Sequence, residues 1–116
     1  MSPTARSLAH HRALGHEADV VERFIRIPKG RAFRRDLFGF ADLLVLDGQP
    51  GSLAVQACIT SDQSTRLAKI AVELRAAKWL AAGNRIVVEG WAKRGPRGKR
   101  KLWTLSATLV PQAEGR

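Results

Sequence analysis

Two apolar segments separated by a short turn constrain the fold of this chain more than any other feature. The segments cover residues 40–46 and 52–59, and the turn between them reads Asp47-Gly48-Gln49-Pro50-Gly51. Turn-forming residues between two such runs predict an antiparallel pair of strands. Because both runs are apolar over much of their length, we expect the strands in the middle of a sheet covered on at least one face.

The remaining patterns predict helices and further strands around this pair. Apolar residues recur at helical spacing over residues 15–27, before Pro28, and again from Thr60 to Gly83. Residues 31–35 are typical of a short edge strand, and residues 85–93 and 101–109 of two longer strands. The predicted order is one helix, three strands, one long helix and two strands. This order predicts an α/β protein.

The two ends of the chain lack such patterns. Residues 1–15 carry basic residues and histidines without a hydrophobic period, which predicts a flexible basic N-terminal arm. No Cys or carboxylate cluster accompanies these histidines in the sequence, so we expect a solvated segment and no metal site there. Residues 16–110 are expected to form a single domain, and residues 111–116 a frayed tail.

The charge of the chain indicates the class of its partner. Twenty Lys and Arg stand against ten Asp and Glu, which gives a net charge of +10 and favours a polyanion such as nucleic acid. The single cysteine, Cys58, cannot form an internal disulfide, so a cytoplasmic setting is the default expectation. No apolar run is long enough for a signal peptide or a membrane span, and we expect no membrane partner.

A polar motif lies on the two apolar strands. Asp42 opens the first strand, and Gln56 and Cys58 lie two positions apart on the second, so their side chains share a face. This arrangement resembles the core of PD-(D/E)XK nucleases. Asp42 matches the motif Asp, Gln56 falls at the second acidic position, and Cys58 falls at the Lys position. Glu22, in the first predicted helix, matches the acidic residue that many members of this fold place there.

The resemblance covers roughly residues 17–107 and implies a restriction-endonuclease-like αβββαββ core with a mixed central sheet. The order of its motifs is similar to that of archaeal Holliday-junction resolvases. Residues 34–39 and 56–61 resemble a phage-associated, resolvase-like subgroup of the same fold. The resemblance therefore implies a structure-selective DNA endonuclease of the nucleoid or of a phage-infected cell. It also implies branched or junction DNA as the substrate and a homodimer, because symmetrical cutting of two strands requires two active sites.

The implied metal ligands are Glu22, Asp42 and Gln56, with Mg²⁺ or Mn²⁺ as the ion. Phosphodiester hydrolysis needs hard cations, and oxygen ligands hold them. Gln56 brings no negative charge, and Asp36 is either an extra carboxylate or an exposed turn residue. Glu22 has the alternative of pairing with Arg26 on a solvated helix face.

The catalytic lysine also needs a replacement, because Cys58 cannot supply an ammonium group. Lys69 or Arg66, in the first turns of the long helix, are the candidates, and a solvated helix face is the alternative for Lys69. Cys58 itself has no histidine partner and is expected to be a small buried hydrophobic residue.

Two clusters of basic residues are expected to hold DNA phosphates. The predicted DNA-binding residues are Arg31, Arg34, Arg35, Arg66, Lys93, Arg94, Arg97, Lys99, Arg100 and Lys101. An alternative to the nuclease is a DNA-binding module that kept the fold and lost the chemistry, and Gln56 and Cys58 favour it. RNA binding has little support, because the chain has no Tyr.

Overall fold

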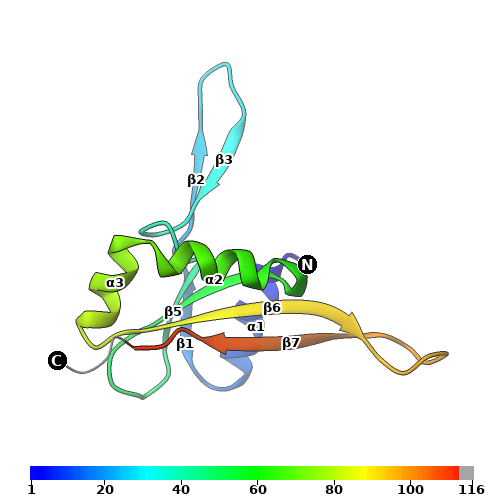
Figure 1. Cartoon of the computed structure of the whole chain (residues 1–116). Coiled ribbons are helices and arrows are strands. Elements are labelled where there is room, and N and C mark those ends of the chain that lie inside the picture. Colours follow the sequence, from blue (N-terminus) through cyan, green and yellow to red (C-terminus); the bar gives the residue numbers. More distant parts are fainter. Residues whose placement is uncertain (113–116) are drawn as a thin grey trace.

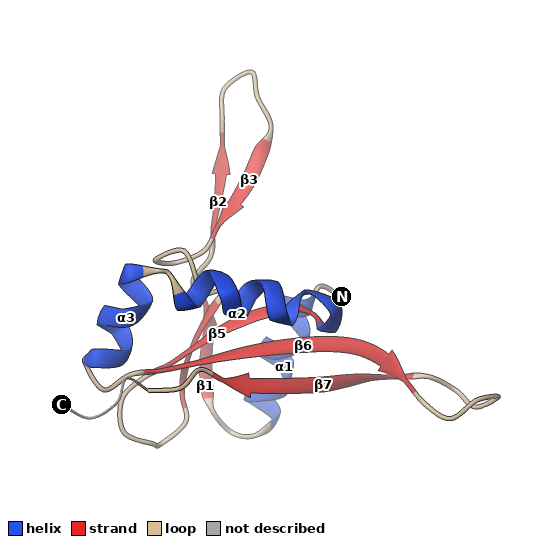
Figure 2. Cartoon of the chain, in the orientation of Figure 1, coloured by secondary structure: helices blue, strands red, loops and turns tan. Residues whose placement is uncertain are grey.

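The computed structural model describes residues 1–112; residues 113–116, most of the expected frayed tail, lie outside the described part. Three helices, one 3₁₀ turn and seven strands follow one another along the chain (Figures 1 and 2). They are α1 (Pro3–Ala13), β1 (Glu17–Val20), β2 (Arg23–Arg26), β3 (Ala32–Arg35), β4 (Leu43–Leu46), β5 (Leu53–Ile59), η1 (Thr60–Asp62), α2 (Gln63–Ala71), α3 (Leu74–Ala81), β6 (Arg85–Arg94) and β7 (Leu102–Leu109).

The central sheet has five strands in the order β1-β4-β5-β6-β7. Strands β5 and β6 are parallel, and every other neighbouring pair in this sheet is antiparallel. A parallel pair needs a crossover connection, which η1, α2 and α3 provide. The predicted α/β class with a mixed central sheet is therefore confirmed.

Helices cover both faces of the sheet (Figure 1). Ala54, Cys58 and Val88 pack with Ile70 of α2 and Ala76 of α3 in one apolar cluster. The alternate residues of the same strands, among them Val55 and Val87, pack in a second cluster against Leu8 of α1. This alternation places Gln56 and Cys58 on the face of β5 that α2 and α3 cover.

The helix predicted over residues 15–27 is wrong, because this segment forms β1 and β2. Val20, Phe24 and Ile27 suggested a buried helical stripe, but 46–61% of each residue is exposed. Their spacing matches a helix by coincidence, since strand β2 pairs with β3 in a separate two-stranded sheet. This β2–β3 hairpin, residues 23–35, extends away from the central sheet (Figure 1).

The flexible N-terminal arm expected over residues 1–15 is also wrong. Residues Pro3–Ala13 form α1, which begins with a proline in its first turn and with the Ser2 hydroxyl accepting from the backbone N–H of Ala5 at 3.1 Å. The residues that α1 buries are Ser7 and His11. Because these are polar, the helix leaves no hydrophobic period in the sequence.

The long helix predicted from Thr60 to Gly83 is divided into α2 and α3 by Val72 and Glu73. The side chain of Gln63, the first residue of α2, makes no hydrogen bond to the end of its own helix within residues 1–112. Its side chain instead enters the sheet, where Nε2 donates to the carbonyl oxygens of Val88, at 3.3 Å, and Ser106, at 2.7 Å. A Cβ at Gly90 would lie 2.5 Å from this side chain, so β6 needs glycine there.

The predicted strands of the central sheet are confirmed, with β6 and β7 joined by the basic loop of residues 93–101. The chain beyond β7 continues along the sheet, where Gln112 Nε2 donates to the carbonyl oxygen of Asn84 at 3.0 Å. Within residues 1–112, no helix has the length and apolar character needed to cross a membrane.

Candidate metal and nucleic-acid site

Three carboxylates meet at one end of strands β4 and β5. Glu22, Asp36 and Asp42, here called the acidic cluster, each offer an oxygen atom, and these atoms lie within 4.8 Å of one another. The three residues come from the β1–β2 connection, the end of β3 and the start of β4. Two of them, Glu22 and Asp42, are residues for which the sequence predicts a role in a metal site.

Backbone hydrogen bonds of Asp42 bring Glu22 to the cluster. The Asp42 N–H donates to the carbonyl oxygen of Val55 at 2.8 Å, which fixes the start of β4 against β5. The Asp42 carbonyl oxygen accepts from the N–H groups of Val21 and Glu22, at 2.9 and 3.3 Å. Glu22 is therefore held beside Asp42 by a connection between strands, and the helix predicted to carry it does not exist.

A tight turn brings Asp36 beside Asp42. Leu37 pairs with Ala41, and the two residues at the tip, Phe38 and Gly39, have φ angles of 56° and 81°. Positive φ is unfavourable for a bulky residue such as Phe38, so the backbone is strained here. The φ of 81° favours glycine at position 39, because other residues are strained in this conformation.

Gln56 connects two carboxylates of the acidic cluster. Its Nε2 donates to Asp36 Oδ2 at 2.9 Å and to Asp42 Oδ2 at 3.3 Å, and the residue is only 4% exposed. Asp42 Oδ2 also accepts from the backbone N–H of Ala57 at 2.8 Å. The amide thus lies among carboxylates without adding another negative charge, and Asp36 belongs to the site.

The acidic cluster raises the pKa of Asp42 from its usual value to about 8. Burial is the largest cause, a hydrogen bond with Asp36 adds to it, and the Ala57 N–H opposes it. The negative charges of Asp36 and Glu22 also contribute. A carboxyl group that resists ionisation through burial and like charges is typical of functional sites. The positive charge of a bound cation would favour the ionised form of this group.

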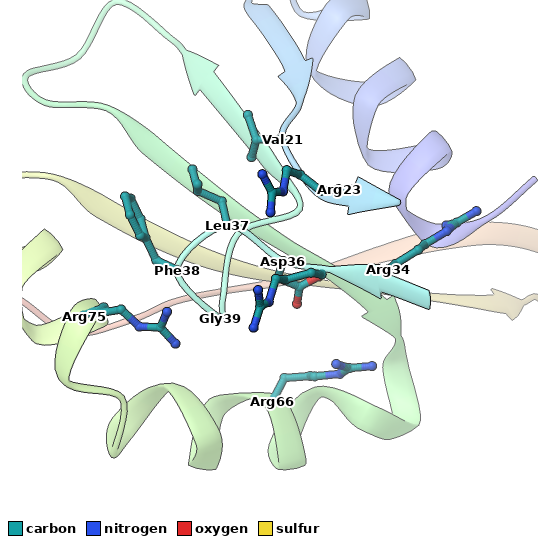
Figure 3. A pocket seen from close by; sticks show the side chains of 10 residues that line it. Val21, Arg23, Arg34, Asp36, Leu37, Phe38, Gly39, Arg66 and Arg75 are labelled. Atoms are coloured by element: carbon teal, nitrogen blue, oxygen red, sulfur yellow. The ribbon is translucent and has the colours of Figure 1, made fainter. Parts of the chain in front are cut away.

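Arginines surround the carboxylates. A cavity of about 590 Å³ beside the cluster is lined by Asp36 and by the arginines Arg23, Arg34, Arg35, Arg66 and Arg75. Figure 3 shows four of these arginines, Arg23, Arg34, Arg66 and Arg75, around Asp36, and they come from β2, β3, α2 and α3. Arg34 Nη1 contacts Glu22 Oε1 at 3.3 Å. The cavity therefore places arginines beside the Asp36 carboxylate at the edge of the acidic cluster, which suits a metal ion together with a phosphate.

No protein family, curated protein or solved structure matches this chain.

The other predicted catalytic residues lie in different places. Lys69 is exposed on α2 and does not line the cavity, whereas Arg66, one turn earlier on the same helix, does. Cys58 is buried in the apolar core, as predicted, and burial raises its pKa while the nearby charge of Arg66 lowers it. Glu22 contacts Arg34 and not Arg26, so the helical pair weighed against its metal role is absent.

The predicted DNA-binding residues divide into two groups in space. Arg34, Arg35 and Arg66 line the cavity, while Arg31 lies outside it near the tip of the β2–β3 hairpin. The second group belongs to the basic loop, which extends beyond the helices at the far end of β6 and β7 (Figure 1). Its members are exposed: Lys93, Arg94, Arg97, Lys99, Arg100 and Lys101.

Sequence reasoning missed two of the cavity arginines. Arg23 directly follows Glu22, but the predicted helix would have pointed it elsewhere. Arg75 reaches the cavity because the helical segment breaks before Leu74, and no pattern in the sequence marks that break. Val72 and Glu73, the two residues at the break, are compatible with a continuous helix.

Proposed function

We propose that this chain is a divalent-metal-dependent DNA endonuclease with a restriction-endonuclease-like fold. The observation that carries the proposal is the acidic cluster, in which Asp42 is buried and Glu22 and Asp36 are half-buried, together with the arginines of the adjacent cavity. Carboxylates hold hard cations, and arginines bind phosphate oxygens through paired hydrogen bonds. The net charge of +10 supports a polyanionic substrate.

The order of elements supports this fold assignment. When the β2–β3 hairpin is set aside, the chain runs α1, β1, β4, β5, α2 with α3, β6 and β7. This is the αβββαββ order that the PD-(D/E)XK resemblance implies. Asp42 at the start of β4 and Gln56 on β5 take the positions of the motif residues.

The carboxylates at the site fit Mg²⁺ or Mn²⁺. Glu22, Asp36 and Asp42 would hold the ion, and Gln56, whose Nε2 now faces Asp36 and Asp42, would add its carbonyl oxygen after a rotation of the side-chain amide. Asp36 supplies the negative charge that Gln56 lacks. Bound there, the ion would polarise the phosphate and lower the pKa of the attacking water.

The protein's own cations position the substrate. Arg66 influences the pKa of Cys58, the residue at the motif Lys position, and it lines the cavity, so we assign to Arg66 the phosphate contact predicted for Lys69. Arg34 and Arg35 hold the phosphate backbone at the opposite side of the cavity. Because guanidinium groups remain protonated, these arginines bind the negatively charged phosphates and do not transfer protons.

The proposed substrate is branched DNA such as a four-way junction, and the proposed active form is a homodimer. The β2–β3 hairpin and the basic loop extend in different directions from the sheet and carry more than half of the 20 Lys and Arg (Figure 1). Widely separated basic segments suit a substrate with several duplex arms. Two-fold symmetry of a junction matches two copies of one site.

A second candidate is a DNA-binding module without catalytic activity. It is favoured by the Gln56 amide, which already satisfies Asp36 and Asp42, and by the absence of a lysine among the cavity-lining residues. This candidate predicts the same DNA affinity and no cleavage.

The test is incubation of the purified protein with labelled four-way junction, duplex and single-stranded DNA, with Mg²⁺, with Mn²⁺ and with a chelator. The nuclease proposal predicts metal-dependent cleavage with a preference for the junction. Binding without cleavage under every condition would favour the inactive module. A protein that neither binds nor cleaves any of these substrates would contradict both candidates.

A further inference from the structure

A second group of potential metal ligands lies on the other face of the sheet, between α1 and β6. We propose that His10, His11 and Glu89 bind a transition-metal ion of the Zn²⁺ class. One ligand atom from each residue lies within 4.8 Å of the others. Two imidazoles and one carboxylate form a donor set that Zn²⁺ takes in proteins. This inference does not depend on the proposed nuclease activity.

Glu89 provides the strongest indication that this group of residues binds a cation. It is 2% exposed in the middle of β6, and its Oε2 lies 2.7 Å from His11 Nε2. The other oxygen, Oε1, is buried and has no hydrogen-bond partner within residues 1–112. A buried carboxylate oxygen without a partner is costly, so the observed pairing with His11 leaves the group only partly satisfied. A cation bound by Glu89 and the histidines would remove that cost.

His16 fixes the orientation of the His11 ring. His11 Nδ1 lies 3.2 Å from His16 Nδ1, and one of these nitrogens must carry the shared hydrogen. When Nδ1 of a neutral His11 ring carries this hydrogen, Nε2 has no proton and its lone pair is free to coordinate a metal. Histidine ligands usually make such a hydrogen bond through their second nitrogen. His16 is therefore a positioning residue and not a ligand.

An ion at this site would strengthen the attachment of α1 to the sheet. Besides His11, the residue that α1 buries is Ser7, whose hydroxyl accepts from Trp91 Nε1 at 2.9 Å. Polar contacts thus provide much of this attachment, and an ion shared by α1 and β6 would strengthen it. Because the ion binds only the folded state, it would stabilise the protein in proportion to the logarithm of its concentration.

The two proposed metal sites differ in place and in chemistry. The acidic cluster includes Asp42, which Gln56 contacts on the α2 and α3 face of β5, whereas Glu89 contacts α1 on the opposite face. Carboxylates suit Mg²⁺ or Mn²⁺, and imidazoles suit Zn²⁺ or Co²⁺. The Asp42→Asn variant therefore disables the first site and leaves the second intact.

The experiment is a titration of the full chain carrying Asp42→Asn with Co²⁺, followed by visible absorption. We expect saturable binding of a single Co²⁺, displaced by Zn²⁺. In the same background, His10→Ala and Glu89→Gln should each weaken Co²⁺ binding by more than about 100-fold. His16→Ala should weaken it by about 10 to 100-fold, as loss of an outer hydrogen bond does. Zn²⁺ should raise the Tm of the Asp42→Asn protein and not that of its His10→Ala derivative.

His10 is half-buried, and its removal takes no side chain from the apolar clusters, so far-UV circular dichroism should show a folded His10→Ala protein. His16→Ala provides a second variant with its own expected size of effect. Absence of saturable Co²⁺ binding in the Asp42→Asn protein would overturn the proposal. Equal affinity in the His10→Ala derivative would also overturn it and leave His11 and Glu89 as a hydrogen-bonded pair.

Discussion

At the scale of single residues, the acidic cluster contains features that lower the stability of the folded state. Asp42 is 3% exposed, and its pKa is raised to about 8 by burial and by its hydrogen bond with Asp36. Phe38 adds a strained backbone conformation at the turn that brings these two aspartates together. A fold under selection for stability alone would have little reason to keep these features, and the cation proposed for this site would account for them.

Glu22 is expected to hold the metal from the edge of the cluster. Its side chain is 13% exposed and contacts Arg34, so Glu22→Gln removes a charge and preserves the shape. We expect weaker cleavage at limiting Mg²⁺, by about 10 to 100-fold, and partial recovery at higher Mg²⁺ or with Mn²⁺. Cleavage assays over a series of metal concentrations measure this, and equal activity of the variant at limiting metal would leave Glu22 only its contact with Arg34.

At the scale of elements, the turn between β4 and β5 is fixed by one ion pair. Arg85 Nη1 and Nη2 donate to the two Asp47 oxygens at 2.7 and 2.8 Å, and these hydrogen bonds hold the pKa of Asp47 well below its usual range. A carboxyl group with a lowered pKa stabilises the folded state above its unfolded pKa of about 3.9, and this contribution is lost as the pH falls.

Asp47→Asn should therefore lower the free energy of unfolding at pH 7 by about 1–3 kcal/mol, and the difference should shrink below about pH 4. Urea unfolding at pH 7 and pH 3 measures both values. Asp19→Asn is the matched control, because its side chain is 89% exposed and its contact with Arg12 should contribute little. A difference that is the same at both pH values would refute the assigned contribution of the ion pair.

The basic loop makes a prediction about DNA affinity that does not require catalysis. Replacing Arg94, Arg97, Lys99 and Arg100 with Ala should weaken binding to all duplex sequences about equally, because phosphate contacts carry no direct base information. The slope of log affinity against log salt should become shallower by up to about 0.9 for each lost contact. Lys78→Ala, on exposed α3, is the control and should leave the slope unchanged. An unchanged slope in the folded quadruple variant would assign DNA binding to the β2–β3 hairpin instead.

The elements that could be predicted from the sequence are those whose side chains follow the period of their structure. Strands β4, β5, β6 and β7 follow from apolar runs and turn residues. Helix α1 could not be predicted, because it buries Ser7 and His11, which carry no apolar signal. The helix predicted over residues 15–27 is wrong because Phe24 and Ile27 belong to a protruding hairpin. The spacing of apolar residues in such a hairpin does not indicate a face that packs in a core.

At the scale of the whole molecule, the chain is less compact than a typical domain of the same length. Its radius of gyration is 15.3 Å, against about 13 Å for a compact domain of this length. The β2–β3 hairpin and the basic loop account for the extension, since both protrude from the sheet (Figure 1). Protruding basic segments enlarge the surface that can reach a nucleic acid without enlarging the core.

The candidate site was predicted in part. Asp42, Glu22 and Gln56 lie together as the motif resemblance implied, although Glu22 arrives from a strand connection and not from a helix. The sequence left Asp36 between two interpretations, because its position depends on a turn with positive φ at Phe38, which sequence patterns do not report. The sequence offers Lys69 or Arg66 as the replacement for the motif lysine, and of these two residues Arg66 is the one that lines the cavity.

The central claim is that Asp36 and Asp42 together hold a catalytic cation, and one comparison tests it most directly. Cleavage of four-way junction DNA in Mg²⁺ is measured for the wild type, Asp42→Asn, Asp36→Asn and the control Asp19→Asn, with DNA affinity measured in parallel. We expect both cluster variants to lose at least about 100-fold in cleavage rate while binding DNA nearly as the wild type does, and Asp19→Asn to match the wild type. Unaltered cleavage by folded Asp42→Asn or Asp36→Asn would contradict the account.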